Sequence, residues 1–515
     1  MLSNKLIKIS VILLAGILIR LYFNIGHIFS DDAYYSYLSY NLLNGDFPGD
    51  YLGYPVSPLR INHLLLTGFS FLIFGANEFS TIVFPFIFSI GAILLTYKFA
   101  ALITGDDAIS FTAAILMAFF PTDVIFATIN FVDISTIFFI NLGIYFLVKS
   151  YKSNKLYLAV WGGTFLFISM QFKEHIYYTS ILLGLLWLYF ILKHRKINIQ
   201  VSIGLLFIIS NFLLEGVVYL FLHNDFLYRL TMTELNYKFC FYNFFPYTAQ
   251  KYNSTTSYWR NLFDQVFLIN GRSVFLRRFY LFLPLVGTIQ SIFNFKKKEY
   301  ILLTYWFLGT LLLLMAFTTS FSGYKPLDLQ ISWYVYPLFM PMVLLSAILI
   351  NRFNNFIKYV LMIFYIAGAL IMCSHYEAYF NKENGDEFKT FLKENPDKFI
   401  YTDHFTKYSI DLIRGFDKKN ISERITGKNF ILNKIKEGDW IVYNKKHIDE
   451  LKLQEFQFPD FEILNSSSFE KIKSFRDFKV YRKVQIICTN IFWKFCNFYF
   501  LFNKNYFYGD CRILR

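Results

Sequence analysis

The sequence predicts an all-α polytopic membrane domain followed by a small α/β domain that lies outside the membrane. Hydrophobic residues make up 55% of the 515 residues, and they come in runs of about twenty, long enough to cross a bilayer as helices. After residue 375 the composition turns abruptly charged and ordinary. We therefore expect residues 1–375 to form the multispan domain, residues 376–484 the α/β domain, and residues 485–515 an aromatic tail to which we assign no role.

About eleven runs are candidate transmembrane helices. The first run is too long for a signal peptide and lacks a small-residue cleavage site, so we expect it to remain as an anchor. The remaining runs alternate with short polar loops, except for two longer loops at 26–79 and 223–273. The expected spans are 7–25, 80–103, 108–127, 129–148, 156–172, 175–192, 199–222, 274–293, 300–319, 331–350 and 355–374.

The basic residues predict the orientation. The loops "KSYKSNK" (149–155), "KHRK" (193–196), "KKK" (296–298) and "NRFNNFIK" (351–358) are rich in lysine and arginine, which concentrate on the cytoplasmic side of membrane proteins. With eleven spans, all four loops and the N-terminus fall on the same side. This places both longer loops and the C-terminal domain outside, in a protein of the cell membrane.

The excess of positive charge does not indicate a nucleic-acid partner. Residues 376–484 hold 21 of the 50 Lys and Arg and 19 of the 36 Asp and Glu, so they are nearly balanced. The surplus, 29 against 17, therefore belongs to the membrane part and largely to its short loops. The five cysteines form no CxxC pair and accompany no histidine cluster, so neither a zinc site nor a disulfide framework is evident.

The expected C-terminal domain alternates strand and helix patterns. "KFIYTDHF", "DWIVYN" and "FKVYRKV" read as strands, and "SIDLIRGF" and "HIDELKL" as short helices between them. We find no Gly-rich phosphate loop and no nucleophile elbow in this part of the sequence. A structural or acceptor-docking role is the expectation.

Two adjacent acids, Asp31 and Asp32, begin the segment "DDAYYSYLSYNLLN" just after the first span. The segment predicts an amphipathic helix that lies flat at the membrane interface and fixes the acids in place. Its polar face would carry Ser36, Ser39, Asn41 and Asn44. The simpler interpretation is that the acids only cap this helix or sit in a solvated loop.

Other ionisable residues occur near the same outer side. Arg20 lies inside the first span, where a charge is costly and usually has a partner; Asp31 or Asp32 is the nearest candidate in sequence. Asp133 stands alone within an apolar run. The remaining candidates are Arg60, His63, Asp123, Lys173, Glu174 and His175.

Acids surrounded by cations suit transfer from a phosphate leaving group. Arginine and lysine can hold a phosphate, and a carboxylate can take a proton from an incoming hydroxyl or amine. At a membrane surface such a leaving group implies a lipid-phosphate donor. Two close carboxylates can also raise the pKa of one of them, which suits a base that works near neutral pH.

The motifs resemble those of the C-type glycosyltransferase superfamily, in the branch of protein O-mannosyltransferases and lipid A aminoarabinose transferases. The resemblance rests on the acidic pair followed by aromatics in "SDDAYYSYLSYNLLNGDFP", then on "YPVSPLRINHLLLTGFSFLIFGANEF", "FFPTDVIFATINFVDISTIFF" and the lysine of "QFKEH". The late element "ISWYVYPLFMPMVLLSA" matches more loosely, because its usual arginine is missing. Lys325 in "FSGYKPLDLQ" is a candidate replacement.

The resemblance implies a fold, an activity and roles for residues. It implies a multispan transferase that uses a polyprenyl- or dolichyl-phosphate-linked sugar and inverts the anomeric carbon in a single displacement. Asp31 would be the catalytic carboxylate, and Asp32 and Asp133 its supporting acids. Lys173 and Arg60, with Lys325, would bind the donor phosphate, and Arg20, His63, Asp123, Glu174 and His175 would support the site.

Two matters stay open at the level of the sequence. A multispan transporter or flippase of a lipid-linked or anionic substrate is the alternative, although internal repeats typical of transporters are not evident. The carboxylates could also bind a divalent metal ion, but no ligand set is spelled out. The sugar is not specified, and the acceptor could be a protein, a lipid or a glycan.

Overall fold

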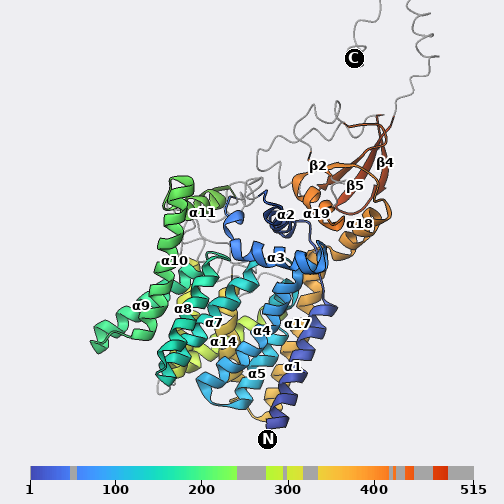
Figure 1. The fold of residues 1–515 in the computed structure, drawn as a ribbon. Helices are drawn as coiled ribbons and strands as arrows, with labels where there is room; N and C mark the ends of the chain where they lie inside the picture. Colours follow the sequence, from blue (N-terminus) through green and yellow to red (C-terminus); the bar gives the residue numbers. More distant parts are fainter. Residues whose placement is uncertain are drawn as a thin grey trace, which may run out of the picture.

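The structure, a computed structural model, describes residues 2–46, 55–239, 274–293, 298–316, 335–416, 422–424, 435–445 and 468–484. Figure 1 shows a bundle of long helices, with the N-terminus at one end and a small sheet domain beyond the other end. The described helices of the bundle are α1 (Leu2–Tyr22), α4 (Glu78–Thr104), α5 (Asp107–Ala118), α6 (Pro121–Phe126), α7 (Val132–Ser153), α8 (Leu156–Met170), α9 (Ile176–His194), α10 (Ile199–His223), α14 (Val274–Phe293), α15 (Lys298–Ala316), α16 (Phe339–Ile350) and α17 (Asn355–Tyr379). Three more helical elements, α2 (Asp31–Asn44), α3 (Ile61–Phe74) and α11 (Tyr228–Phe239), lie towards the end where the sheet domain sits, and the short 3-10 helices η1 (Ser57–Leu59) and η3 (Tyr336–Leu338) precede α3 and α16.

The described part of each predicted span is largely helical, but the one predicted at 108–127 is not a single helix. Residues 317–319 and 331–334 of two predicted spans lie outside the described residues. α5 ends at Ala118, and α6 begins at Pro121. Proline has no N–H to donate and disfavours helical backbone in the residue before it. Phe120 accordingly has an extended backbone, with φ −67° and ψ 114°. The chain then leaves the helical path again before α7 begins at Val132.

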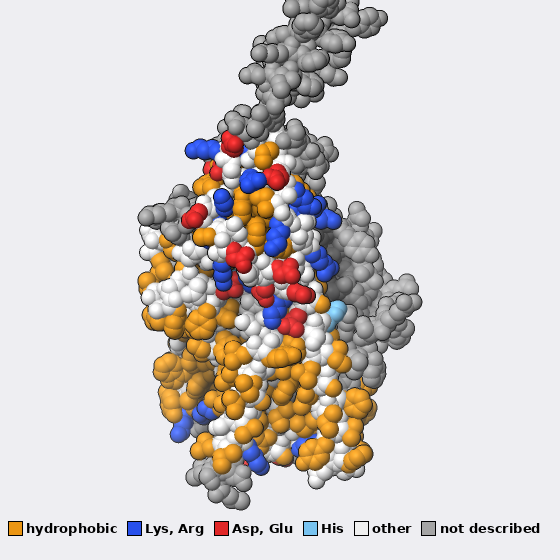
Figure 2. Space-filling model, turned by 90° about the vertical axis from the view of Figure 1, so that its right-hand side faces the viewer, with side chains coloured by type: hydrophobic (Ala, Val, Ile, Leu, Met, Phe, Trp, Pro, Cys, Tyr) orange, Lys and Arg blue, Asp and Glu red, His pale blue; other side chains and the backbone are white. Residues whose placement is uncertain are grey.

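The described helices support a multi-pass membrane protein. Five of them, α4, α7, α9, α10 and α17, are long and apolar enough to cross a membrane, and six shorter apolar helices accompany them. Figure 2 shows a broad hydrophobic surface over the bundle, with charged side chains gathered beyond it towards the sheet domain and a few at the opposite end. The full set of eleven spans and their orientation remain predictions.

The sheet predicted in the C-terminal part is present. Its strands are β1 (Ile400–Thr402), β2 (Glu423–Arg424), β3 (Trp440–Asn444), β4 (Phe469–Ser474) and β5 (Phe478–Lys483), in the order β2-β1-β3-β5-β4. β1 pairs in parallel with β2 and β3, and β5 pairs antiparallel with β3 and β4. The helices α18 (Lys382–Glu394) and α19 (His404–Ile413) accompany the sheet. The helix predicted in "HIDELKL" lies outside the described residues, as does the 485–515 tail.

α2 forms where the acid pair predicts it, but the expected polar face towards water is wrong. Ser36 and Ser39 are fully buried, as are Tyr34, Tyr35 and Leu38. One side of α2 packs on α3 and another on α19 of the sheet domain. Tyr408 of α19 stacks on Tyr37 with ring centroids 4.0 Å apart. The hydroxyls of these two serines donate hydrogen bonds to backbone carbonyls one turn earlier in α2, Ser36 to Asp32 and Ser39 to Tyr35. Neither buried hydroxyl is therefore left without an acceptor.

Candidate functional site

The acid pair occupies the first turn of α2, and its two members have different surroundings. Asp31 is half-buried, whereas Asp32 is fully buried. The Asp32 Oδ2 atom lies 2.6 Å from Nδ1 of His27 and accepts the N–H of Ile28 at 2.8 Å, while Oδ1 accepts the N–H of Ser30 at 2.8 Å. Asp32 therefore folds the preceding loop back onto the start of α2.

These contacts correct two expectations for Asp32. Burial alone would raise the pKa of the Asp32 carboxyl, but the charge and hydrogen bond of His27 and the two backbone N–H groups lower this pKa below its usual value. Asp32 is therefore not the member of the pair whose pKa is raised. Nor do these hydrogen bonds cap α2, because the N–H groups that Asp32 accepts belong to Ile28 and Ser30, which precede the helix.

Asp133 lies in the first turn of α7 and has two partners from the segment between α8 and α9. The Lys173 Nζ atom lies 2.7 Å from Asp133 Oδ1, and Nε2 of His175 lies 3.1 Å from the same oxygen. All three side chains are buried. His175 therefore contacts the same carboxylate oxygen that forms the ion pair with Lys173.

A second charged network surrounds Glu174. Its carboxylate lies 3.5 Å from an Arg60 amino group and 3.4 Å from an Arg229 amino group. Burial would raise the pKa of Glu174, but Arg60 and Arg229 hold it below the usual value. Arg229 also forms an ion pair with Glu215 of α10 at 2.6 Å. Arg60 in turn donates to the hydroxyl of Tyr35 on α2, which connects this network to the acid helix.

Three buried polar atoms next to these networks have no hydrogen-bond partner among the described residues. They are Nε of Arg60, Nε2 of His63 and the hydroxyl of Tyr177. The His63 ring makes an edge contact with Tyr35 at a centroid distance of 5.0 Å. Buried polar groups are nearly always paired, so each of these atoms is a candidate for contact with a polar ligand.

Asn130 connects the two groups of predicted residues. Its amide donates to the Ser36 hydroxyl at 3.1 Å and to the Asp32 carbonyl at 3.4 Å. Val132, the neighbour of Asp133, packs in the same apolar cluster as Tyr34 and Tyr35 of α2. The N-terminal ends of α2 and α7 therefore lie close together, although the sequence separates them by a hundred residues.

Arg20 does not pair with the acid pair, so that expectation is wrong. Its guanidinium is fully buried and donates to Asp123 Oδ2 at 2.5 Å and to the Ser89 hydroxyl at 2.6 Å. Asp123 also accepts the hydroxyls of Ser89 and of Tyr336. Arg20 and Asp123 thus form a buried network inside the bundle that connects α6, α4 and the late "YPL" element to α1.

Some contributors were not identified from the sequence. His27 stands five residues before Asp32, and its position directly after an apolar span was the only signal available. Glu215 and Arg229 are 14 residues apart, on α10 and α11, and no motif in the sequence relates them to Glu174. Lys325 lies outside the described residues. Among the described residues, no group of three His, Cys, Asp or Glu side chains could hold a metal ion, so we derive no step through a metal.

Comparison with known proteins agrees with these features. Residues 61–215 match the model of the dolichyl-phosphate-mannose-protein mannosyltransferase family. The matched part begins at α3 and ends in α10, and so contains His63, Asp123, Asp133 and Lys173. No curated protein matches the chain in sequence.

Solved structures with the same fold were found. ArnT from Cupriavidus metallidurans bound to undecaprenyl phosphate is 10% identical, with a TM-score of 0.56 and coverage of 93% of this chain and 98% of that one. The apo oligosaccharyltransferase of Archaeoglobus fulgidus is 13% identical, with a TM-score of 0.54 and coverage of 94% and 75%. A third structure is the archaeal oligosaccharyltransferase AglB from Archaeoglobus fulgidus in complex with an inhibitory peptide and a dolichol-phosphate. It is 13% identical in sequence, with a TM-score of 0.51 and coverage of 94% of this chain and 75% of that one.

These findings confirm the resemblance to C-type glycosyltransferases. By sequence it is carried by residues 61–215, and by fold it extends over nearly the whole chain.

Proposed function

We propose that this protein transfers a sugar from a polyprenyl-phosphate-linked donor to an acceptor outside the cytoplasm. The acceptor supplies a hydroxyl or amine and belongs to a protein, a lipid or a glycan. The observation that supports the proposal is that α2, which bears the acid pair, contacts Arg60 through Tyr35, in a charged cluster where Arg60 Nε, His63 Nε2 and the Tyr177 hydroxyl have no partner in the described structure. A phosphate and a sugar offer the oxygen atoms that these groups need.

The lipid-phosphate donor class is supported by the comparisons. The matched family takes its name from a dolichyl-phosphate mannose donor. Two of the solved structures with this fold hold undecaprenyl phosphate or a dolichol-phosphate. The long apolar helices of this chain offer a surface for the tail of such a lipid.

In the proposed reaction Asp31 is the general base. It takes the proton of the acceptor while the acceptor oxygen or nitrogen forms a bond to the anomeric carbon of the sugar. On the opposite face the bond from that carbon to the phosphate oxygen breaks, and its electron pair leaves with the lipid phosphate. The configuration at the carbon inverts, and no covalent sugar–protein intermediate is required.

The cations would neutralise the leaving phosphate. Lys173 holds Asp133 at 2.7 Å, so a phosphate would share the lysine with Asp133 rather than meet an isolated charge. Arg60 is held by Tyr35 and Glu174 but keeps Nε for the ligand. Asp32 would act by position: its bonds to His27, Ile28 and Ser30 set the first turn of α2, on which Asp31 stands.

Incubation with a radiolabelled polyprenyl-phosphate sugar tests the proposal against the transporter alternative. Protein reconstituted in liposomes should release free polyprenyl phosphate and move the label to an acceptor in a membrane extract. A transporter would move the lipid-linked sugar between leaflets and leave it intact. Intact donor after incubation with protein, lipid and glycan acceptors would contradict the proposal.

A further inference from the structure

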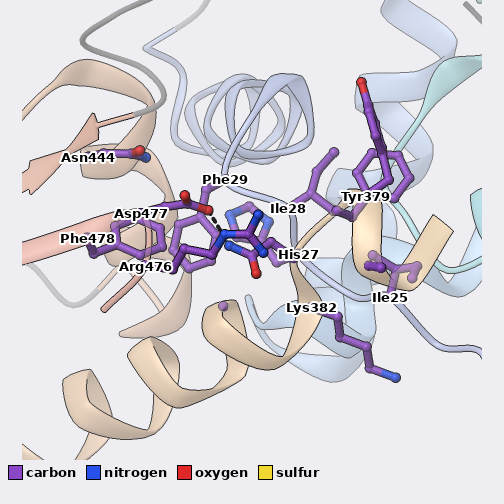
Figure 3. A pocket seen from close by; sticks show the side chains of 14 residues that line it. Ile25, His27, Ile28, Phe29, Tyr379, Lys382, Asn444, Arg476, Asp477 and Phe478 are labelled. Carbon is purple, nitrogen blue, oxygen red and sulfur yellow. Dashed lines mark hydrogen bonds between the residues drawn. The ribbon is translucent and has the colours of Figure 1, made fainter. Parts of the chain in front are cut away.

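A cavity of ≈ 220 Å³ lies between the helix bundle and the sheet domain, apart from the candidate site (Figure 3). Its walls come from the loop between α1 and α2, from the junction of α17 and α18, and from the start of β5. The acid pair, Arg60 and Lys173 do not line it.

The polar groups on these walls favour an anion. Lys382 and Arg476 line the cavity together with the amides of Asn381 and Asn444. Lys382 forms an ion pair with Glu377 at 3.0 Å, and the one lining carboxylate, Asp477, accepts the Asn381 amide. The Asn444 amide donates one of its two hydrogens to Thr406 at 3.0 Å. The guanidinium of Arg476 is exposed and forms no ion pair with any described residue. An anion held here would give Arg476 a bidentate partner.

His27 is the buried member of this wall. Its ring is only 6% exposed, and Nε2 has no hydrogen-bond partner in the described structure. Because Nδ1 is taken by the Asp32 carboxylate at 2.6 Å, Nε2 is the ring atom left to contact a polar ligand in the cavity. Figure 3 shows the His27 ring and the Arg476 side chain near the centre of the cavity wall.

The cavity opens at the level where two lipid-facing helices end. α1 exposes Leu18, Leu21 and Tyr22 in its last turns, and α17 exposes Ile371 and Tyr379. Seen from the side of these helices, the hydrophobic surface gives way to charged side chains just below the sheet domain (Figure 2). A lipid lying along this surface would bring its head group to the cavity.

We propose that this cavity binds a phosphate group, with a phospholipid head group as its source. Arg476 and Lys382 provide the charge, Asn381 and Asn444 the neutral donors, and His27 the buried end of the site. The carboxylates of Glu377 and Asp477 lie near the same positive groups and lower the affinity of the cavity for an anion. A phosphate bound in the cavity would contact His27, which in turn contacts Asp32. It would thereby stabilise the first turn of α2 without contacting the sugar donor.

The test is calorimetric titration of the full-length protein in detergent at constant ionic strength. The probes are dioctanoyl phosphatidylglycerol, dioctanoylglycerol as the same tails without phosphate, and inorganic phosphate. We expect the phosphatidylglycerol to bind and dioctanoylglycerol not to bind. Arg476→Gln should weaken binding roughly tenfold or more, the usual size of a charge-assisted hydrogen bond. His27→Gln should weaken it as well.

A matched control isolates the site. Arg482→Gln removes the same charge from a residue of β5 that does not line the cavity, and it should bind like wild type. Equal binding of inorganic phosphate, sensitive to Arg476→Gln, would support the phosphate site but with a soluble source. Binding that is unaffected by Arg476→Gln, or no phosphate binding at all, would overturn the proposal.

Discussion

Asp32→Asn tests the distinct positions that the structure gives to the two acids. The fully buried Asp32 carboxylate accepts three donors, from His27 and Ile28 at Oδ2 and from Ser30 at Oδ1. Asparagine keeps the shape but has only one acceptor oxygen. His27 can adapt by changing its tautomer, but the amide NH₂ must then face the N–H of either Ile28 or Ser30.

One buried backbone N–H therefore loses its acceptor in either orientation of the asparagine. An unsatisfied buried donor costs about 1–3 kcal/mol, and the lost charge on the His27 bond adds to this. Asp32→Asn should lower the thermal unfolding midpoint of the protein in detergent, measured by intrinsic fluorescence. Asp46→Asn, the same change at the exposed end of the α2 segment, should not.

A double variant sharpens the result. His27→Gln and Asp32→Asn remove the two ends of one contact, so their effects on stability should be less than additive, by about 0.5–3 kcal/mol. An Asp32→Asn protein with the wild-type midpoint would refute the view that Asp32 holds the start of α2.

Three further predictions follow from the same structure. Lys173→Ala should weaken binding of a polyprenyl-phosphate sugar more than it lowers the unfolding midpoint; unchanged donor affinity would remove Lys173 from the site. Burial, followed by the charge of Arg60, lowers the pKa of His63 from 6.5 to about 3. The neutral ring therefore contributes stability that is complete above pH 6.5 and is lost as the pH falls towards 3. The thermal unfolding midpoint of His63→Gln should accordingly fall less over this pH range than that of the wild-type protein. In a background without accessible native cysteines, Ser153→Cys should react with an impermeant reagent only from the cytoplasm and Lys398→Cys only from outside; labelling of Ser153→Cys from outside would overturn the predicted orientation.

The helices were predictable because burial in a membrane leaves a simple pattern. Long apolar runs must satisfy their backbone groups internally, so they form helices wherever they occur. The error at 108–127 arose at Pro121, where local backbone chemistry outweighs hydropathy. Three of the five described strands, β1, β3 and β5, coincide with predicted segments, because runs of β-branched and aromatic residues are a local signal, whereas β2 and β4 were not predicted.

The interaction partners of individual side chains were much less predictable than the helices and strands. The carboxylate for Arg20 was sought eleven and twelve residues away, but Asp123 lies 103 residues away, where helix packing brings α6 against α1. Likewise the pattern of α2 did not show that α19 would cover it, because that contact depends on a second domain. The sequence identified residue types that suit a reaction, and the fold decided which of them meet.

Turnover by Asp31→Asn tests the central claim most directly. Asparagine matches aspartate in size and serves nearly as well at a helix N-terminus, but it cannot accept a proton. The measurement is the rate of label transfer from a polyprenyl-phosphate sugar by wild-type and Asp31→Asn protein, with their unfolding midpoints compared as a control. We expect the rate to fall by roughly 10²–10⁴, the usual size of a general-base contribution, with a midpoint close to wild type. Full activity of the Asp31→Asn protein would contradict the proposed mechanism.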